Sequence, residues 1–356
     1  MPSILVTGGT GLVGRAIVDA LADVPVLSLT RHGAPGWSAG GLRDSRAVSS
    51  LLSAGGGHVV AACDADHVTH VHGDVTQPQL GLPDAVYSDL ADQVKLVIHA
   101  AGVTDYTTPR AVTNAVNVTG TRHVARFAER ADAPLYHVST GYVRAQGSSV
   151  RGRFGAQVYL DSKREAESIA ATCGTFAAMV RPSLVFGHSA DGSTASFQGL
   201  HRLVGMVLQN RMPLLPFPAE TRVDFLPRDV VGRAIARLAR DRVHGDAWLT
   251  AGSDALTFGR VVELLLAFAA ACGRQVDSPR FVSRDMIDRL IKPAGGAAIA
   301  RRIDLLLALT SHLIADPLPS SLGANDRVDL EAALWRGTAF WAERNGWAAA
   351  MDPVSA

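Results

Sequence analysis

Two side chains able to exchange a proton, Tyr159 and Lys163, stand four residues apart in the sequence. On a helix, residues at this spacing share a face, so the phenol and the ammonium are expected to point toward the same cleft. A nearby cation favours the phenolate and should lower the pKa of Tyr159. Such a phenol can exchange a proton with an oxygen whose carbon gains or loses hydride. The alternative is a surface pair of helical residues four apart, which has no catalytic role.

Two hydroxyl groups, those of Ser139 and Thr140, directly follow the apolar run 135–138. Ligands of open parallel sheets bind beyond the carboxyl ends of the strands, so a hydroxyl at this place can hydrogen-bond a substrate carbonyl. Either side chain could instead cap the following turn. Together with Tyr159 and Lys163, the pair predicts a catalytic Ser/Thr-Tyr-Lys set.

Glycines recur at every third position in the N-terminal sequence ILVTGGTGLVG, between an apolar run and a helical pattern. Glycine lets the backbone turn sharply and approach a pyrophosphate, and a helix N-terminus offers unpaired N–H groups and a partial positive charge. A tight turn without a ligand is the plainer alternative. The motif predicts a dinucleotide site formed by Gly8, Thr10, Gly11, Leu12, Val13 and Gly14.

The second apolar run, 24–29, leads to Arg31. At this position a dinucleotide-binding domain that uses NAD usually carries an acidic residue, which binds the ribose 2′-hydroxyl. An arginine can pair with the 2′-phosphate of NADP, which a carboxylate would repel. Arg31 therefore favours NADP(H) over NAD(H). A solvated arginine at the end of a strand is the alternative.

The elements that must position these residues alternate along the first half of the chain. Short apolar runs at 4–6, 24–29, 68–72, 95–99 and 135–138 are separated by helical patterns or loops, apart from a Gly- and Ser-rich insertion at 33–66. This alternation predicts an α/β fold, a doubly wound parallel sheet of Rossmann type. Further on we expect a helix over 199–209, Asp229 as the N-cap of a helix over 230–240, a strand over 247–250 and a mostly helical final third.

Two lobes follow from this pattern. Residues 1–185, completed by about 226–252, are expected to form the NADP-binding domain, and residues 186–225 and 253–356 a smaller, mainly helical substrate lobe. The leucine-rich segment 301–322 is expected to pack in the core of that lobe. Dimerisation or contact with an acyl chain remains the alternative for this segment.

Composition narrows the functional classes. The chain has 356 residues, is 47% hydrophobic and has a formal net charge of +1, which lacks the basic excess of a nucleic-acid binder. Its three cysteines form no C-x-x-C pair, its N-terminus has no secretory pattern, and its longest apolar stretches are too short to span a membrane. We therefore expect a cytoplasmic protein without a metal site, in which His99 and His137 are core histidines.

The motifs TGGTGLVG, HGDVT, VIHAAG, NVTGT, VSTGYV and RPSLVFG, together with the Tyr159/Lys163 pair, run in this order over residues 3–187. In this order they resemble the signatures of extended short-chain dehydrogenases/reductases. The motifs VSTGYV, RPSLVFG and VDFLPRDVV are most similar to the thioester-reductase and fatty-acyl-reductase (male-sterility type) branch. Members of that branch reduce activated acyl groups or aldehydes with NADPH.

The resemblance implies further roles. Asp74 and Val75 would flank the adenine, Ala100, Ala101 and Gly102 would line the cofactor cleft, and Asn117 would brace the catalytic strand. Thr140 matches the usual catalytic Ser/Thr position, with Ser139 as the fallback. Lys163 would also hold the nicotinamide ribose, and the segment from Pro182 to Val185 would close over the nicotinamide.

These features predict an NADPH-dependent reductase of a carbonyl or acyl-thioester substrate, either free or delivered on an acyl carrier. Sugar-nucleotide epimerases, sugar-nucleotide dehydratases and hydroxysteroid-type dehydrogenases share the scaffold and remain alternatives, although Arg31 weighs against the first two. A non-enzymatic NADPH sensor is a further alternative, against which the intact Tyr159/Lys163 pair weighs.

Overall fold

The computed structural model describes residues 3–31, 67–144, 155–283, 286, 289 and 316–347. Outside this part of the chain lie the insertion expected after the second strand, which contains Cys63 as one of the three cysteines, and most of the leucine-rich segment 301–322. Within the described part, neither Cys173 nor Cys272 forms a disulfide. No helix of this part has both the length and the apolarity that crossing a membrane requires.

A seven-stranded parallel sheet forms the centre of the fold, in the order β11-β6-β5-β4-β1-β2-β3. This order confirms the predicted doubly wound α/β fold. The strands are β1 (Ser3–Thr7), β2 (Val26–Thr30), β3 (Val68–His72), β4 (Val94–His99), β5 (Leu135–Val138), β6 (Phe176–Pro182) and β11 (Gly245–Leu249).

Strands β1 and β2 are buried at every position. Parallel sheets are covered on both faces, so their strands consist mostly of apolar residues without polar alternation. This is why short apolar runs located these strands in the sequence. Strand β6 was not predicted, although its residues 177–182 are all buried.

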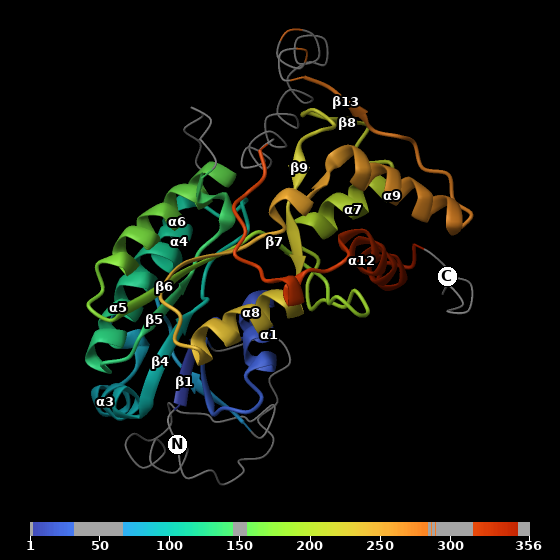
Figure 1. The fold of residues 1–356 in the computed structure, drawn as a ribbon. Helices are drawn as coiled ribbons and strands as arrows, with labels where there is room; N and C mark the ends of the chain where they lie inside the picture. Colours follow the sequence, from blue (N-terminus) through green and yellow to red (C-terminus); the bar gives the residue numbers. More distant parts are fainter. Residues whose placement is uncertain are drawn as a thin grey trace. The chain divides into compact units, whose positions relative to one another are not determined.

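Helices cover both faces of this sheet (Figure 1). Helix α1 (Leu12–Ala20) and helix α8 (Arg228–Arg240) lie on one side. A Cβ atom on Gly232 of α8 would come within 2.2 Å of the Ala16 carbonyl oxygen of α1, so a glycine is needed where these two helices touch. The other side carries α3 (Asp84–Gln93), α4 (Arg110–Asn114), α5 (Gly120–Arg130) and α6 (Ala156–Ala171).

A π-helical segment, η2 (Ala115–Thr119), joins α4 to α5, so residues 110–130 form one continuous helical run with a wider turn in it. Such π turns are rare and often occur at functional sites. The turn contains Asn117, one of the residues predicted to serve the cofactor site.

The direction of the strand connections changes between β1 and β4, which are neighbours in the sheet. Ligands of doubly wound sheets bind in the crevice at the carboxyl ends of the strands at such a switch point. The motifs that follow β1 and β4 are therefore the first place to examine for a site.

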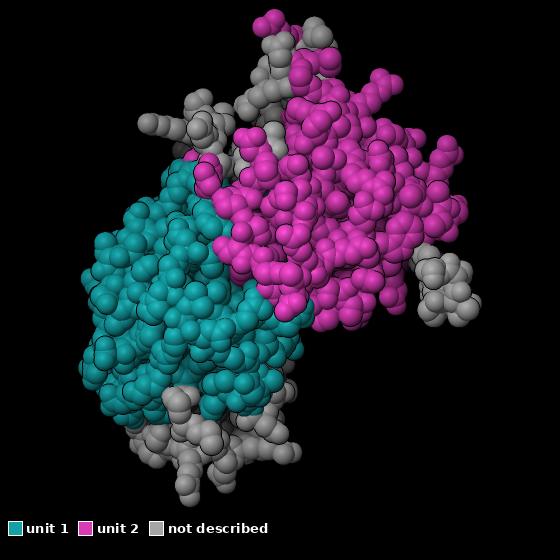
Figure 2. Space-filling view, viewed as in Figure 1, with its two compact units in different colours: residues 1–143, 158–182, 231–248 teal, residues 144–157, 183–230, 249–356 magenta. Residues whose placement is uncertain are grey.

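Two compact units divide the chain, coloured separately in Figure 2. The first contains the sheet and comprises residues 1–143, 158–182 and 231–248. The second comprises residues 144–157, 183–230 and 249–356. The division into a cofactor domain and a substrate lobe remains a functional prediction.

Helices α7 (Leu200–Leu208), α9 (Phe258–Ala271) and α12 (Leu330–Arg344) pack against one another in the second unit. Its short strands pair as β7 (Leu184–Phe186) with β10 (Phe225–Pro227), β9 (Arg222–Val223) with β12 (Leu256–Thr257), and β8 (Leu214–Leu215) with β13 (Arg280–Phe281). Thr257 caps α9 by accepting from the Arg260 amide at 3.2 Å, and Asp329 caps α12 by accepting from the Ala332 amide at 3.0 Å.

Candidate active site

Helix α6 carries the proposed proton-transfer pair. Tyr159 and Lys163 are 9% and 5% exposed, which argues against the solvated surface pair considered above. The Lys163 ammonium donates to the Val138 carbonyl oxygen at 2.7 Å, and Val138 is the last residue of β5. This bond fixes α6 to the carboxyl end of the strand that leads into Ser139 and Thr140.

The structure treats these two hydroxyl groups differently. The Thr140 hydroxyl lowers the pKa of the nearby Tyr159 phenol, and its oxygen accepts from the Tyr142 amide at 3.4 Å. The Ser139 hydroxyl is buried and has no hydrogen-bond partner among the described residues. The contact with Tyr159 supports Thr140, and not the fallback Ser139, as the third member of the set.

Burial sets the protonation of the pair. Loss of solvation raises the pKa of Tyr159 to about 12, against a smaller lowering effect of the Thr140 hydroxyl. The pKa of Lys163 falls to about 8 because its ammonium is also desolvated, although the Glu167 carboxylate partly offsets this. The lowered pKa predicted for Tyr159 is therefore wrong for this structure. At neutral pH the phenol holds its proton and can donate it.

Asn117 braces α6 and the loop after β4. Its amide nitrogen donates to Ser162 Oγ at 2.9 Å and to the Val103 carbonyl oxygen at 3.2 Å, and its amide oxygen accepts from the Val103 N–H at 2.8 Å. Ser162 in turn donates to the Tyr159 carbonyl oxygen at 2.6 Å. These bonds correct the prediction that Asn117 braces the catalytic strand, since that contact is made by Lys163. A direct contact of Asn117 with cofactor remains a prediction.

Sequence reasoning missed two residues at this site. The ring of Tyr106 lies 5.3 Å from that of Tyr159, measured between centroids, and burial raises the pKa of its phenol. Arg181 of β6 forms a two-bond pair with Glu167 of α6, at 2.9 and 2.8 Å, and a 2.7 Å ion pair with Asp246 of β11. The only sequence signals were the position of Tyr106 after β4 and that of Arg181 in RPSLVFG.

The glycine motif forms a close-packed turn between β1 and α1. Gly8 has a φ of +73°, and a Cβ atom there would come within 2.6 Å of Ala101 backbone atoms. A Cβ atom on Gly14 would lie 2.0 Å from the Gly8 carbonyl oxygen. The turn thus lies directly against the residues that follow β4, which brings together two of the predicted cofactor motifs.

The exposed part of this turn suits a phosphate group. Thr10 and Gly11 are exposed, Leu12 and Val13 are partly exposed, and Gly11 is the N-cap of α1 without any side-chain cap. The first N–H groups of a helix bind anions well when no side chain caps them. A side chain at Gly102 would reach within 3.4 Å of Asn117 Oδ1 and 3.9 Å of Lys163 Nζ, so this glycine leaves space beside the lysine. These residues fit a nicotinamide dinucleotide.

Most of the other predicted cofactor residues lie at or just after the carboxyl ends of strands. Arg31 is exposed directly after β2, and Asp74 and Val75 follow β3. Asp74 uses one carboxylate oxygen to accept from the Thr76 amide at 2.8 Å, which stabilises the turn. Ala100 and Ala101 are partly exposed after β4, whereas Pro182 ends β6 and Val185 belongs to β7 in the second unit. Their contacts with a cofactor remain predictions.

Two neutral histidines lie next to Lys163 in the core. Burial, with a smaller effect of the Lys163 charge, lowers the pKa of His99 to about 3 and that of His137 well below its ordinary value. Their ring centroids are 5.2 Å apart. Nowhere in the described part of the chain do three or more histidine, cysteine, aspartate or glutamate side chains gather in a way that could hold a metal ion.

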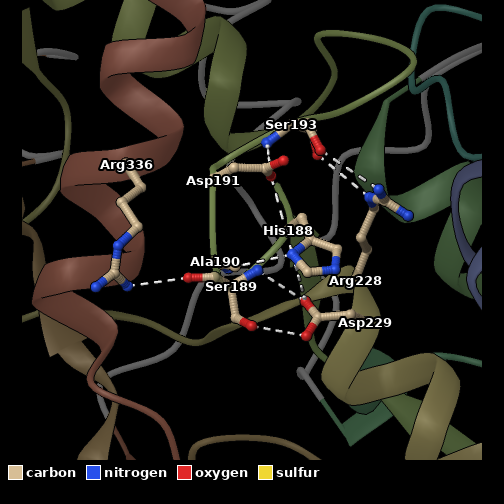
Figure 3. Close-up of polar contacts among 8 residues, drawn as sticks. All are labelled: His188, Ser189, Ala190, Asp191, Ser193, Arg228, Asp229 and Arg336. Atoms are coloured by element: carbon tan, nitrogen blue, oxygen red, sulfur yellow. Dashed lines mark hydrogen bonds and ion pairs between the residues drawn. The ribbon is translucent and has the colours of Figure 1, made fainter. Parts of the chain in front are cut away.

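A second polar cluster fixes the loop after β7, in the second unit (Figure 3). Asp229 accepts from the backbone N–H and the hydroxyl of Ser189 at 2.8 and 2.7 Å, and Arg336 of α12 donates to the Ser189 carbonyl oxygen at 2.9 Å. Helix α8 begins at Arg228, so Asp229 lies within its first turn. The prediction of Asp229 as N-cap is therefore wrong, because its carboxylate binds this loop.

Comparison with known proteins identifies the family of the chain. The family described as male sterility protein matches residues 6–235. A glycine betaine reductase from Emericella nidulans is 26% identical over 257 residues, which are 67% of this chain and 20% of the relative. The chain thus spans about a fifth of that relative's length.

Solved structures share the fold. The terminal R domain from the myxalamid PKS-NRPS biosynthetic pathway superposes with a TM-score of 0.68 at 21% identity, covering 99% of this chain and 93% of that domain. A thiolation-reductase di-domain from an archaeal non-ribosomal peptide synthetase gives 0.67 at 13% identity, covering 97% of this chain and 76% of the other. The family match confirms the resemblance to the male-sterility type that the motifs indicated, and these structures share the fold of the chain. The chain belongs to the male sterility protein family, the branch of extended short-chain dehydrogenases/reductases that its motifs indicated.

Proposed function

We propose that this protein is an NADPH-dependent reductase of a carbonyl or acyl-thioester substrate. The observation that carries the proposal is the buried arrangement in which the Thr140 hydroxyl acts on the Tyr159 phenol while Lys163, one helical turn further on, is hydrogen-bonded to the end of β5. These residues lie beside a glycine-rich turn that fits a dinucleotide, which supports the same proposal. The similarity in fold to a reductase domain also supports it.

Three side chains divide the work at the substrate oxygen. The Tyr159 phenol, protonated at neutral pH, donates its proton to the oxygen as negative charge develops there. The Thr140 hydroxyl positions that oxygen. The Lys163 ammonium stabilises the phenolate that remains. When bound, NADPH supplies the hydride that the carbonyl carbon accepts.

A thioester substrate adds one step to this scheme. After the carbon has gained hydride, the tetrahedral adduct must re-form its carbonyl and expel the thiolate, which leaves an aldehyde. Tyr159 and Thr140 would first stabilise the oxygen of the adduct and then release it. An aldehyde or ketone instead takes the Tyr159 proton and leaves as the alcohol.

Cofactor choice and substrate delivery complete the proposal. Arg31 would pair with the 2′-phosphate of NADPH, a role consistent with its exposed position after β2. The resemblance to a thiolation-reductase di-domain supports an acyl group delivered on a carrier-bound pantetheine arm. A free acyl-pantetheine thioester is the simplest substrate of this class.

The test is NADPH oxidation by the purified chain with acyl-pantetheine thioesters, the corresponding aldehydes and a set of ketones. We expect turnover that Tyr159→Phe lowers by about 10²- to 10⁴-fold, the usual contribution of a general acid. Tyr87→Phe is the matched control, because Tyr87 packs edge-on against Phe127 in the core at 5.2 Å. NADPH binding without turnover of any member of the panel would contradict the proposal.

A further inference from the structure

His99 is a buried polar side chain that the proposed mechanism leaves unused. His99 is the last residue of β4 and is 0% exposed. Its Nδ1 lies 2.7 Å from Thr7 Oγ1 at the end of β1, and its Nε2 lies 3.0 Å from Thr121 Oγ1 in the first turn of α5. Both nitrogens therefore have a hydroxyl partner.

The directions of these bonds follow from the Asn117 carbonyl. Thr121 Oγ1 lies 2.6 Å from this carbonyl oxygen, which can only accept a hydrogen bond. Thr121 therefore donates its one hydroxyl hydrogen to Asn117. His99 Nε2 must then be the donor to Thr121. A neutral imidazole has one N–H, so Nδ1 carries no hydrogen and accepts from the Thr7 hydroxyl.

Thr7 completes the series of hydrogen bonds at its other end. Having donated its hydrogen to His99, the Thr7 oxygen accepts from the Ala101 N–H at 3.3 Å. The bonds thus run in one direction, from Ala101 through Thr7, His99 and Thr121 to the carbonyl oxygen of Asn117. Burial and the nearby Lys163 charge keep the pKa of His99 at about 3, so the ring stays neutral at working pH.

The two ends of this series of hydrogen bonds belong to different parts of the candidate site. Ala101 lies against the glycine turn proposed to hold the dinucleotide. Asn117 lies in the π turn and holds Ser162, which bonds to the backbone of Tyr159. His99 thus links the cofactor turn to the helix that carries the proton donor, beside the direct bonds of Asn117 to Val103.

We propose that His99, as the neutral Nε2–H tautomer, is a positioning residue that keeps the dinucleotide turn and the Tyr159 helix in register for reduction. This inference rests on the proposed function of the same site. It predicts that the hydrogen bonds on the two sides of His99 affect different constants, kcat on the side of Thr121 and the Kd of NADPH on the side of Thr7. A histidine that merely fills the core would affect only stability.

Variants separate these two arms of hydrogen bonds. Thr121→Val removes the arm toward Asn117, and we expect kcat to fall by about 10- to 100-fold, the cost of a small misplacement of a catalytic group, with the Kd of NADPH within about twofold of wild type. Thr7→Val removes the arm toward Ala101 and should instead raise the Kd of NADPH with kcat at saturation nearly unchanged. Of the conservative variants, His99→Gln can still donate toward Thr121 and should retain more kcat than His99→Ala.

Thr113→Val is the matched control. Its hydroxyl is buried in α4, on the same helical run, but bonds only to the Pro109 carbonyl oxygen at 3.2 Å among the contacts that the structure records. We expect wild-type kcat and Kd for this variant. The proposal is overturned if Thr121→Val and Thr7→Val match this control, or if both change kcat and Kd alike.

A second readout does not depend on turnover. Nitrogen-15 NMR of histidine-labelled protein, with His99 assigned from its loss in His99→Gln, should show a protonated Nε2 and a bare Nδ1 from pH 7.5 down to 5.5. A protonated Nδ1, or a charged ring at pH 7, would overturn the bond order. If wild type reduces no substrate, the proposed function fails while this spectrum and the NADPH affinities still decide the role of His99.

Discussion

At the scale of single residues, burial opposes the charge of both members of the proton-transfer pair. Tyr159 keeps its proton because the pKa of its phenol is about 12, and Lys163 titrates near pH 8. An acid that stays protonated suits the reductive direction, in which the enzyme must donate a proton. The lysine is then the group whose charge state changes within the working range of pH.

The pH dependence of reduction follows from Lys163. Below pH 8 its ammonium is charged and, in the proposed mechanism, would stabilise the developing phenolate, whereas above pH 8 this charge is lost. We expect kcat/KM for reduction to be constant up to about pH 8 and to fall above it. Because kcat/KM reports the ionisations of the free enzyme, a profile from pH 6 to 10 checks this directly. An activity that rises through pH 8 would contradict the assignment.

Arg31 decides the choice between cofactors in this account. Arg31→Ala should raise the Kd of NADPH by roughly 10- to 100-fold, since a charge-assisted contact contributes about 1.5–3 kcal/mol. The Kd of NADH should stay within about twofold of wild type because NADH lacks the 2′-phosphate. Arg15→Ala, another exposed arginine of the first unit, is the control. Equal effects of Arg31→Ala on both cofactors would remove the 2′-phosphate role.

The sequence predicted the candidate catalytic residues better than the hydrogen-bond partners that hold them in place. Tyr159, Lys163 and Thr140 come together as expected because helical spacing and strand ends are local properties of the chain. Local pattern contains no information on which side chains meet across the fold. Asn117 therefore received the wrong partner, and the pairing of Arg181 with Glu167 was not foreseen.

At the scale of elements, the turn between β1 and α1 requires a glycine where the helix packs back on it. Gly14→Ala should lower the free energy of unfolding by about 1–3 kcal/mol or more, because its Cβ atom would lie 2.0 Å from a backbone oxygen. Gly11→Ala is the milder comparison, with its nearest contact at 3.2 Å and a φ of −76°. Urea unfolding measures both, and equal losses would contradict this explanation.

Elements with one dominant signal were predictable. Strands β3 and β5 have the predicted bounds, and α7 differs from its prediction by one residue at each end. Asp229 shows where local rules fail: an acidic residue before a helical pattern predicts an N-cap, but a loop 40 residues away in sequence takes its carboxylate. Tertiary contacts of this kind override local preference.

At the scale of the whole molecule, buried neutral histidines make stability depend on pH. His99 and His137 have lowered pKa values in the folded state, whereas an unfolded histidine titrates near pH 6.5. Below pH 6.5 the unfolded state therefore binds protons that the folded state does not bind. Stability should fall with decreasing pH, by about 1.4 kcal/mol per pH unit for each such histidine.

His137 offers the cleaner test of this effect, because neither ring nitrogen has a hydrogen-bond partner among the described residues. In urea unfolding, His137→Leu should lose about 1.4 kcal/mol less than wild type between pH 7.5 and 5.5. An unchanged pH dependence would show that His137 is protonated or bonded in the folded protein.

The central claim is that cofactor hydride reaches an acyl or carbonyl carbon while Tyr159 supplies the proton. Its most direct test is mass spectrometry of the product formed from an acyl-pantetheine thioester and NADPH deuterated at C4 of the nicotinamide, on the face from which hydride leaves. The account predicts an aldehyde or alcohol that carries cofactor deuterium at the former carbonyl carbon, and a loss of most product in Tyr159→Phe. Product without deuterium, or equal yield from Tyr159→Phe, would contradict it.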